Sequence, residues 1–337
     1  MLRTRVFQGS HYDIGFQRGQ EIVDFPLPQS RDEAILFAKR CCEVAQAVYP
    51  PILEEFEGLL DGSRLDRNNF TSYCFGRKEG ILRGCTSFAV LPPRATIPLV
   101  GRNYDWAYAD RRWCEARWIR PQTGFETISY THHWAGSPDA LNEHGLFVVM
   151  NSLPKVEAKH PGLQWNAVIK AMMETCRNVG EARQFIVEVP HLRSMTYLIA
   201  DAAGEAIVAE ATPEGVKIRE PVEGYIIATN HRVGGSDDRP TSQHRYRRVE
   251  ELLNKRYGSI DEKGMECILQ DHTGNICSGS HKIADQSGEL MGWRAADQSS
   301  ELMGWGTIWS LIAYPSERRL RIAPGHPCKT PYHPLHF

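Results

Sequence analysis

The sequence predicts a layered α+β fold, and three observations carry this prediction. Apolar residues recur at helical spacing in the first quarter of the chain, short apolar runs typical of strands begin near residue 85, and strands return after further helical segments. Because strands and helices come in groups, the pattern favours a layered α+β domain over regular βαβ winding. A chain of 337 residues with 42% hydrophobic composition can bury a substantial core.

The first 84 residues are predicted to be mainly helical. Ser30 and Glu33 form a capping-box pattern, which predicts the start of a long helix with apolar residues along one face. The pair Pro50-Pro51 interrupts this helix, and a second apolar stripe of helical spacing follows it. We therefore expect a helical segment before the first strand.

From residue 85 onward, short apolar runs predict strands. Several of these runs are apolar on both faces, which is typical of buried sheets. Helical patterns at about 164–188 and about 241–270 separate them. The expected strands are 88–91, 97–100, 146–150, 195–200, 206–209, 225–228, 307–313 and 319–323.

Composition and charge exclude several classes of partner. With 39 Lys and Arg against 41 Asp and Glu, the net charge of −2 gives no general attraction to nucleic acid or to an anionic membrane. No apolar run approaches the ~20 residues that cross a bilayer, and the first residues lack the apolar stretch of a secretory signal. The sequence therefore predicts a cytoplasmic protein without nucleic-acid or membrane partners.

Cysteine and histidine spacing predicts no metal, cofactor or disulfide framework. The nine cysteines are odd in number and never spaced as C-x-x-C, so we expect buried, reduced thiols. Histidines are numerous, but no H-E-x-x-H pattern places two of them on one helix face. They are interpreted as isolated loop residues.

One internal repeat is present near the C-terminus, where residues 284–293 are nearly duplicated by residues 296–305. A period that occurs only twice does not indicate a solenoid. A tandem duplication tolerated in a surface loop explains it, since loop length costs little closure entropy. The alternative is a loop whose Met and Trp side chains cover a substrate pocket.

The segment Gly84-Cys85-Thr86-Ser87 predicts a nucleophile that is made by cutting the chain. Glycine can adopt conformations closed to other residues, so the Cys85 thiol can attack the Gly84 carbonyl and form a thioester that water cleaves. A cysteine that then begins a chain has an α-amine with a pKa of about 8 within reach of its thiol. A buried structural thiol is the simpler alternative for this residue.

The chain resembles the acyl-coenzyme A:6-aminopenicillanic acid acyltransferase family, which is related to choloylglycine hydrolases within the N-terminal nucleophile hydrolases. The resemblance implies a four-layer αββα sandwich. It also implies that residues 1–84 form a propeptide-like small chain and residues 85–337 the catalytic domain. The motifs that carry it are Gly9 to Gly19, Gly84 to Ser87, Gly101 to Trp106, Asn151, Ala228 to His231 and Ser242 to Arg245.

Arg102 and Asp105 follow Cys85 by 17 and 20 residues, which suits a hairpin whose second strand runs back beside the first. The resemblance implies that Asp105 holds the α-ammonium group or orients the substrate, and that Arg102 keeps the thiol anionic. Taken without Cys85, the two residues would be interpreted as a weak surface ion pair.

Three further positions follow from the resemblance. Asn230, at the end of an apolar strand, matches the family's oxyanion-hole asparagine. Asn151 matches a second position that contributes a backbone or side-chain contact, and Arg245 a supporting arginine near the nucleophile. Turn formation for the two asparagines, and a solvated helix face for Arg245, are the alternatives.

The resulting hypothesis is a self-cleaving enzyme, made as a zymogen, that hydrolyses a linear amide or transfers an acyl group through a Cys85 acyl-enzyme. Its partners would be a small-molecule amide or acyl thioester and its own cleaved N-terminal fragment, held as a heterodimer; a higher oligomer is compatible with the sequence. Scattered arginines neither prove nor exclude a coenzyme A site. The alternative is an uncleaved, non-catalytic member of the same fold that binds a small molecule.

Overall fold

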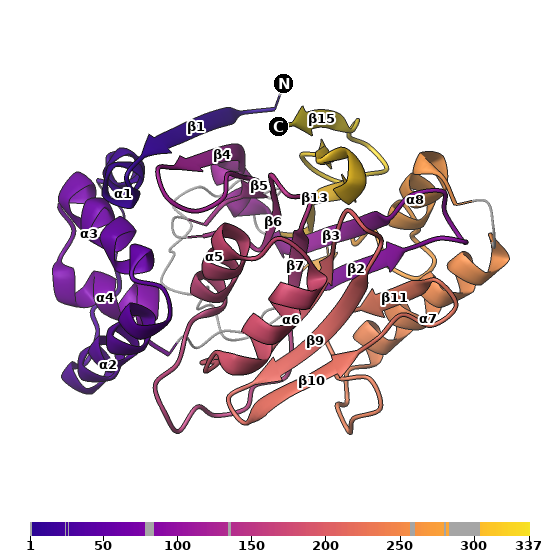
Figure 1. Cartoon of the computed structure of the whole chain (residues 1–337). Helices are drawn as coiled ribbons and strands as arrows, with labels where there is room; N and C mark the ends of the chain where they lie inside the picture. The colour runs from indigo at the N-terminus through magenta and orange to yellow at the C-terminus, as the bar shows by residue number, and fades with distance from the viewer. Residues whose placement is uncertain are drawn as a thin grey trace.

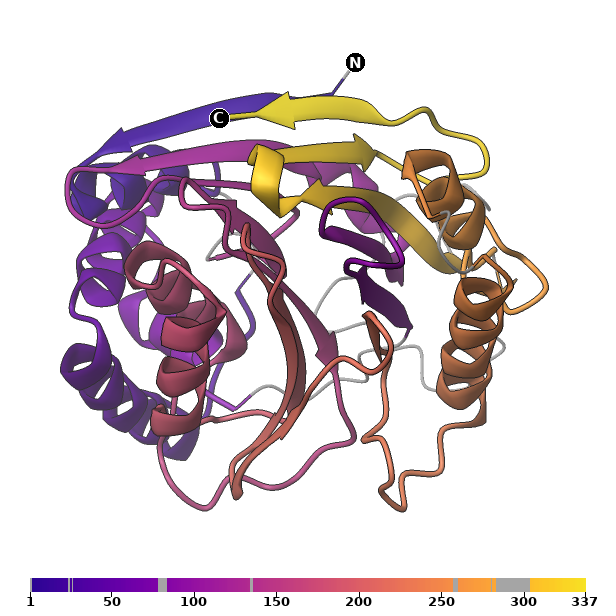
Figure 2. The ribbon, with the colours of Figure 1, turned by 45° about the vertical axis from the view of Figure 1, so that its right-hand side comes forward.

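The computed structural model describes residues 2–23, 25, 27–77, 84–133, 136–256, 260–279, 281–282 and 304–337. Two sheets are stacked face to face, and helices cover the outer face of each (Figure 1, Figure 2). This arrangement confirms the predicted four-layer αββα sandwich.

The larger sheet has the strand order β1-β4-β5-β6-β7-β8-β9-β10. Only β1 and β4 pair in parallel; the other neighbours in this sheet are antiparallel. The strands are β1 (Thr4–Gly9), β4 (Glu115–Pro121), β5 (Thr127–Thr131), β6 (Asp139–Asn142), β7 (Phe147–Ser152), β8 (Met195–Ala200), β9 (Ala206–Thr212) and β10 (Gly215–Arg219).

The second sheet has the order β11-β2-β3-β13-β14-β15, with β12 paired to β13 outside this path. All its pairs are antiparallel, which suits strands joined by short connections and by helical excursions. The strands are β2 (Cys85–Val90), β3 (Leu99–Ala107), β11 (Tyr225–Ala228), β12 (His281–Lys282), β13 (Gly304–Tyr314), β14 (Arg319–Ala323) and β15 (His333–His336).

Helices form the two outer layers. Six of the described helices lie on the side of the larger sheet: α1 (His11–Gly19), α2 (Asp32–Val48), α3 (Pro51–Ser63), α4 (Arg67–Phe75), α5 (Trp165–Thr175) and α6 (Val179–Glu188). On the other side, α7 (Pro240–Lys255) and α8 (Glu262–Leu269) cover the second sheet (Figure 2). Short 3-10 turns, η1 (Tyr108–Trp113) and η2 (Pro315–Glu317), follow β3 and β13.

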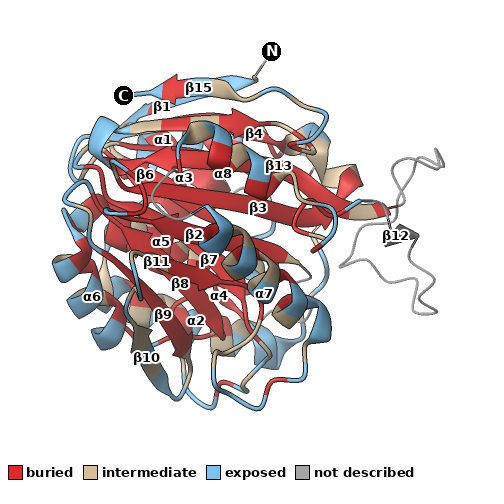
Figure 3. Ribbon diagram, turned by 90° about the vertical axis from the view of Figure 1, so that its right-hand side faces the viewer, coloured by how far each residue is buried: buried red, intermediate tan, exposed pale blue. Residues whose placement is uncertain are grey.

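Each interface between layers has its own apolar core. Met172 of α5 belongs to the core beneath the larger sheet, to which α2, α3 and α4 also contribute. Phe147 and Trp309 belong to the core between the sheets, and Phe88 packs with Val249 in the core under α7 and α8. The central strands are therefore buried on both faces, whereas the edge strands β1, β10 and β15 and the outer faces of the helices are exposed or partly exposed (Figure 3). In the described part of the chain, no helix is both long and apolar enough to cross a bilayer.

Helices α1 and α3 cross in backbone contact. A Cβ atom added to Gly15 would lie 2.0 Å from the carbonyl oxygen of Glu55, and one added to Gly58 would lie 2.0 Å from that of Tyr12. Only glycine allows this approach. The crossing brings the Glu55 side chain into the core beneath the larger sheet.

The predicted helices and strands are present, with two corrections. The capping box at Ser30 is wrong: α2 begins at Asp32 without a side-chain cap, and the Ser30 N–H donates to Asn69 Oδ1 at 2.8 Å. A capping box does occur at α1, where Ser10 and Asp13 bond reciprocally.

The second correction concerns strands that the apolar pattern missed, namely β1, β4, β5, β6, β10, β12 and β15. The expected strand 97–100 is also only the start of the longer β3. The repeat at 284–305 lies outside the described residues, except for residues 304–305 at the start of β13.

Candidate active site

Cys85 is the first residue of β2, and β2 forms an antiparallel hairpin with β3. In this register Cys85 pairs with Tyr104 and Ser87 with Arg102, so the predicted hairpin is confirmed. Side chains alternate across the sheet. The Cys85 side chain therefore belongs to the core between the sheets, while Thr86 faces α7.

The carbonyl group of Gly84, directly before Cys85, accepts a hydrogen bond that polarises it. The backbone N–H of Asp105 donates a hydrogen bond to the carbonyl oxygen of Gly84, with an N···O distance of 3.1 Å. Gly84 has a φ angle of +64°, in the left-handed region. A Cβ atom at this position would lie 2.5 Å from Asp105 Oδ2, so only glycine fits here.

The backbone nitrogen of Cys85 is oriented by Asn230, which follows β11. Its N–H donates to Asn230 Oδ1 at 2.8 Å, and the same oxygen accepts from Nη2 of Arg245 at 2.8 Å. The other Arg245 nitrogen, Nη1, donates to the Cys85 carbonyl oxygen and, at 2.8 Å, to Thr86 Oγ1. Asn230 Nδ2 donates to the backbone and side-chain oxygens of Ser152 at 3.0 and 3.1 Å.

Arg102 approaches the thiol from between the sheets. Its Nη2 lies 3.9 Å from Cys85 Sγ, and its Nη1 donates to the Met150 carbonyl oxygen at 2.7 Å and to Asn151 Oδ1 at 3.4 Å. Arg102 is fully buried and pairs with Asp139 of β6 at 3.2 Å. The interpretation of Arg102 and Asp105 as a surface ion pair is therefore wrong, since both side chains are buried.

Asn151 joins the two sheets at this point. It is the last residue but one of β7, and its Nδ2 donates to Ser87 Oγ of β2 at 2.8 Å. Its side-chain oxygen faces Arg102. Both groups of the amide are thus used inside the core, as a buried polar side chain requires.

Burial dominates the electrostatics of the nucleophile. It raises the pKa of the Cys85 thiol, and Asp105 raises it further, while Arg102 and Arg245 oppose the shift. Burial also raises the pKa of Asp105 to about 6, against Arg245 and the hydrogen bond from Thr307. The thiol is therefore neutral at pH 7, and the Asp105 carboxyl group beside it has a pKa of about 6.

Aromatic side chains border the thiol within the core between the sheets. Tyr104, the pairing partner of Cys85, stacks on Trp309 with ring centroids 4.0 Å apart. Trp106 and His132 lie 5.8 and 5.7 Å from the Tyr104 ring. Burial lowers the pKa of His132 to about 3, so this ring is neutral at physiological pH. The thiol therefore has aromatic neighbours on this side, in addition to the charged groups of Arg102, Asp105 and Arg245.

The sequence model of the acyl-coenzyme A:6-aminopenicillanic acid acyl-transferase family matches residues 93–327, which is more than half of the chain. The chain belongs to this family. Membership makes the protein an enzyme of the N-terminal nucleophile amidohydrolase or acyltransferase type. The match begins after Gly84 and Cys85, so it does not itself include the predicted nucleophile.

Two solved structures share the fold of this family member. A variant of conjugated bile acid hydrolase from Clostridium perfringens is similar with a TM-score of 0.53 and 13% identity over 75% of this chain and 97% of that one. Penicillin V acylase from Agrobacterium tumefaciens gives a TM-score of 0.50 and 12% identity over 75% and 86% of the two chains. No curated protein sequence matches the chain significantly.

The six side chains that the sequence predicts for the active site all lie around the Gly84-Cys85 junction. Sequence reasoning gave no role to three residues that hold them: Asp139 and Thr307 lie in no motif, and Ser242 only begins the motif that contains Arg245. Asp139 pairs with Arg102, Thr307 Oγ1 donates to Asp105 Oδ1 at 2.7 Å, and Ser242 Oγ accepts from the Asn230 N–H at 2.7 Å. Each comes from a different strand or helix, so tertiary pairing alone reveals it.

Proposed function

We propose that this family member cleaves its own chain between Gly84 and Cys85, and that the new N-terminal Cys85 then transfers acyl groups. The observation that carries the proposal is the Gly84 carbonyl group. It accepts a hydrogen bond from the Asp105 N–H at 3.1 Å directly before a buried cysteine. A donor aimed at a carbonyl oxygen stabilises the negative charge that develops when the carbon is attacked.

In the proposed cleavage the Cys85 sulfur attacks the Gly84 carbonyl carbon while its proton passes to a base. The Asp105 carboxylate is the candidate base, because its pKa of about 6 leaves it largely ionised at pH 7. The bond between the Gly84 carbon and the Cys85 nitrogen breaks, the nitrogen takes up a proton, and a thioester remains. Water hydrolyses the thioester to a Gly84 carboxylate and a free Cys85 thiol.

In the proposed acyl transfer, the freed Cys85 amine takes the thiol proton and the thiolate attacks an amide or thioester carbonyl. The leaving amine or thiol departs with a proton, and water or a second amine releases the acyl group. Asn230 Oδ1, which contacts the Cys85 nitrogen, would orient the new amine. The sequence predicts that Asn230 contributes to the oxyanion hole. Its Nδ2 group donates to Ser152 in this structure, so it would have to turn from Ser152 towards the oxyanion.

The aromatic residues beside the thiol favour an apolar acyl group. Tyr104, Trp106 and Trp309 form an aromatic cluster at the thiol, and Arg102 Nη2 lies 3.9 Å from the sulfur. The two similar structures are named a hydrolase and an acylase, which fits this class of reaction.

Intact mass and N-terminal sequencing of the purified protein test the proposal. We expect pieces of roughly 9 to 10 kDa and roughly 28 to 29 kDa by length from 38.2 kDa, the larger one beginning with Cys85. Cys85→Ala should give one uncut chain without turnover of acylated amino acids, acylated lactams or acyl-coenzyme A thioesters. Cys114→Ala, which removes a buried thiol of the same core, should cleave normally. An uncut wild-type chain would instead support the non-catalytic alternative.

A further inference from the structure

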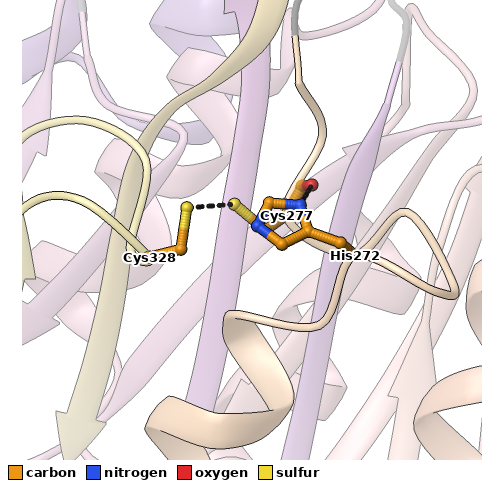
Figure 4. A group of neighbouring side chains, drawn as sticks. All are labelled: His272, Cys277 and Cys328. Atoms are coloured by element: carbon orange, nitrogen blue, oxygen red, sulfur yellow. Dashed lines mark hydrogen bonds between the residues drawn. The ribbon is translucent and has the colours of Figure 1, made fainter.

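Two loops beside the second sheet bring two thiols and two imidazoles together. His272 and Cys277 lie in the loop after α8, and His326 and Cys328 lie between β14 and β15. The side-chain donor atoms of His272, Cys277 and Cys328 all lie within 4.8 Å of one another. Figure 4 shows the two sulfurs facing each other with the His272 ring beside them. None of these residues belongs to the site around Cys85.

The distance between the two sulfurs fits a shared metal ion. Cys277 Sγ and Cys328 Sγ are 3.6 Å apart, whereas a disulfide bond measures about 2.05 Å. Two thiolates bound to one tetrahedral Zn²⁺ at about 2.3 Å would be separated by about 3.8 Å. The observed distance between the two sulfurs is therefore close to the distance between two sulfur ligands of a tetrahedral zinc ion.

The two imidazoles are held in the way that metal-binding histidines usually are. His272 Nδ1 contacts the Cys277 carbonyl oxygen at 3.1 Å, which leaves Nε2 as the nitrogen on the sulfur side. His326 Nε2 bonds the Tyr108 hydroxyl at 3.0 Å, and its Nδ1 lies 3.8 Å from Cys277 Sγ. A hydrogen bond on one ring nitrogen fixes the ring and presents the other nitrogen to a metal.

The backbone already fixes both loops. The Cys277 N–H donates to the Asp271 carbonyl oxygen at 2.9 Å, and Gln270 Nε2 donates across to the Pro327 carbonyl oxygen at 3.1 Å. These hydrogen bonds hold the two loops together independently of the thiols and imidazoles, so little rearrangement is needed to bind a metal ion. Such preorganisation lowers the cost of forming a site.

We propose that His272, Cys277 and Cys328 bind a Zn²⁺ ion, with His326 Nδ1, 3.8 Å from Cys277 Sγ, as the ligand for the fourth position. Two thiolates and two imidazoles form a ligand set that selects zinc. On binding, two sulfur–zinc bonds form and the two thiols release their protons to solvent. The chain would thus contain a closed, structural metal site.

This site would stabilise the position of Asp105. Ser278, next to Cys277, exchanges backbone and side-chain hydrogen bonds with Thr307 of β13 at 3.0 and 3.1 Å. Thr307 in turn donates to Asp105. A zinc ion bound to Cys277 would therefore be connected to Asp105 through Ser278 and Thr307.

Metal binding to the full-length protein tests the inference. After treatment with a chelator and a reductant, we expect the chain to bind one equivalent of Zn²⁺, and Co²⁺ to give the thiolate charge-transfer absorption of a tetrahedral site. The double variant Cys277→Ser with Cys328→Ser should lose this band and bind zinc more than about 100-fold more weakly. Cys267→Ser, which removes an exposed thiol of α8, should bind as the wild type does.

Cys85→Ser should also retain the cobalt spectrum, so the metal site and the proposed cleavage are tested separately. A Cys277–Cys328 disulfide in protein purified without reductant, combined with no metal uptake after reduction, would overturn the inference. A cobalt spectrum unchanged in the double variant would do the same. If the double variant does not fold, the wild-type spectrum decides, because a site without thiolate ligands gives no such band.

Discussion

At Gly84 the backbone conformation and the Asp105 carboxylate leave no space for a side chain. Gly84→Ala places a Cβ atom 2.5 Å from Asp105 Oδ2 in a left-handed conformation. We expect self-cleavage to slow by at least about tenfold, since a change of only 1.4 kcal/mol in the barrier has this effect. The uncut fraction, followed on a denaturing gel after cell-free synthesis, measures the rate.

Gly204→Ala is the matched control for this prediction. Gly204 also has a positive φ, +89°, but a Cβ atom there would meet nothing within 4 Å. This variant should lose some stability through backbone strain and cleave at the wild-type rate. Equal cleavage of both variants would show that contact between residue 84 and Asp105 does not matter.

The raised pKa of Asp105 predicts pH-dependent cleavage. Burial shifts this pKa from 3.8 to about 6, with Arg245 and Arg102 opposing the shift and Cys85 beside it. If the carboxylate is the base, the cleavage rate should rise as the pH increases through about 6. Asp105→Asn should remove this rise and slow cleavage by about 10² or more, as pH-jump experiments on freshly synthesised chain would measure.

The same shift has the opposite sign for stability. Because the folded-state pKa lies above the unfolded value, ionisation of Asp105 costs folding free energy as the pH increases from about 4 to about 6. Asp105→Asn should therefore gain stability relative to wild type over this range, in denaturant titrations. A pH profile of cleavage that is identical in both proteins would contradict the assignment of the base.

Among the secondary-structure elements, β4 shows why the apolar pattern missed strands. Its Glu115 and Arg117 point the same way and pair at 2.7 Å, and Arg3, which lies just before β1, approaches Glu115 at 3.2 Å. A segment with charged residues at alternate positions looks exposed when read alone. In the fold it lies between β1 and β5, where its charges meet partners from outside the segment.

Helices α1, α3 and α5 are joined by buried charges around Glu55. Arg18 of α1 bonds Glu55 of α3, and Lys170 of α5 lies 2.6 Å from the other carboxylate oxygen. Burial would raise the pKa of Glu55, but Lys170 and Arg18 outweigh it and lower the pKa to about 2. A cavity of about 50 Å³ lies beside these side chains.

Glu55→Gln should cost about 3–5 kcal/mol of folding free energy at pH 7, because it removes the buried anion that pairs with Arg18 and leaves Lys170 with Glu174 alone. The sign follows from the lowered pKa: Glu55 stabilises the fold above pH 4.5, and this contribution is lost as the pH falls towards 2. Denaturant titrations at pH 7 and pH 3 should therefore show a smaller difference between variant and wild type at the lower pH.

Glu57→Gln on the same helix is the control. Glu57 pairs with Arg67 at the surface, where both side chains are largely exposed, so its loss should cost at most about 1 kcal/mol. Equal effects of the two substitutions would show that the buried charges around Glu55 do not bind the helices together.

For the whole molecule, the cores explain how a cut chain would stay together. The core beneath the larger sheet combines Phe56 and Leu59, from before residue 85, with Val148 and Met172, from after it. In addition, β1 pairs with β4 at the edge of the larger sheet. These contacts do not depend on the bond between Gly84 and Cys85, which supports the proposed heterodimer.

The sequence predicted the residues of the candidate active site better than the residues that hold them in position. Gly84, Cys85, Arg102 and Asp105 lie close together in the chain, so a single hairpin is enough to bring them into contact. Asp139 and Thr307 could not be predicted, because only the stacking of two sheets and the pairing of β13 with β3 bring them to the hairpin. For the same reason the sequence did not predict the contact between Cys277 and Cys328, which are 51 residues apart in the chain.

By itself the sequence determined the layered α+β class, most of the buried strands and the likeness to an acyl-transfer family, because periodicity and short motifs are local properties. The tertiary structure alone decided which face of β2 the thiol occupies, which carboxylate pairs with Arg102, and that the Gly84 carbonyl accepts a hydrogen bond from Asp105. These features depend on strand register and sheet stacking, and contacts between distant segments set both.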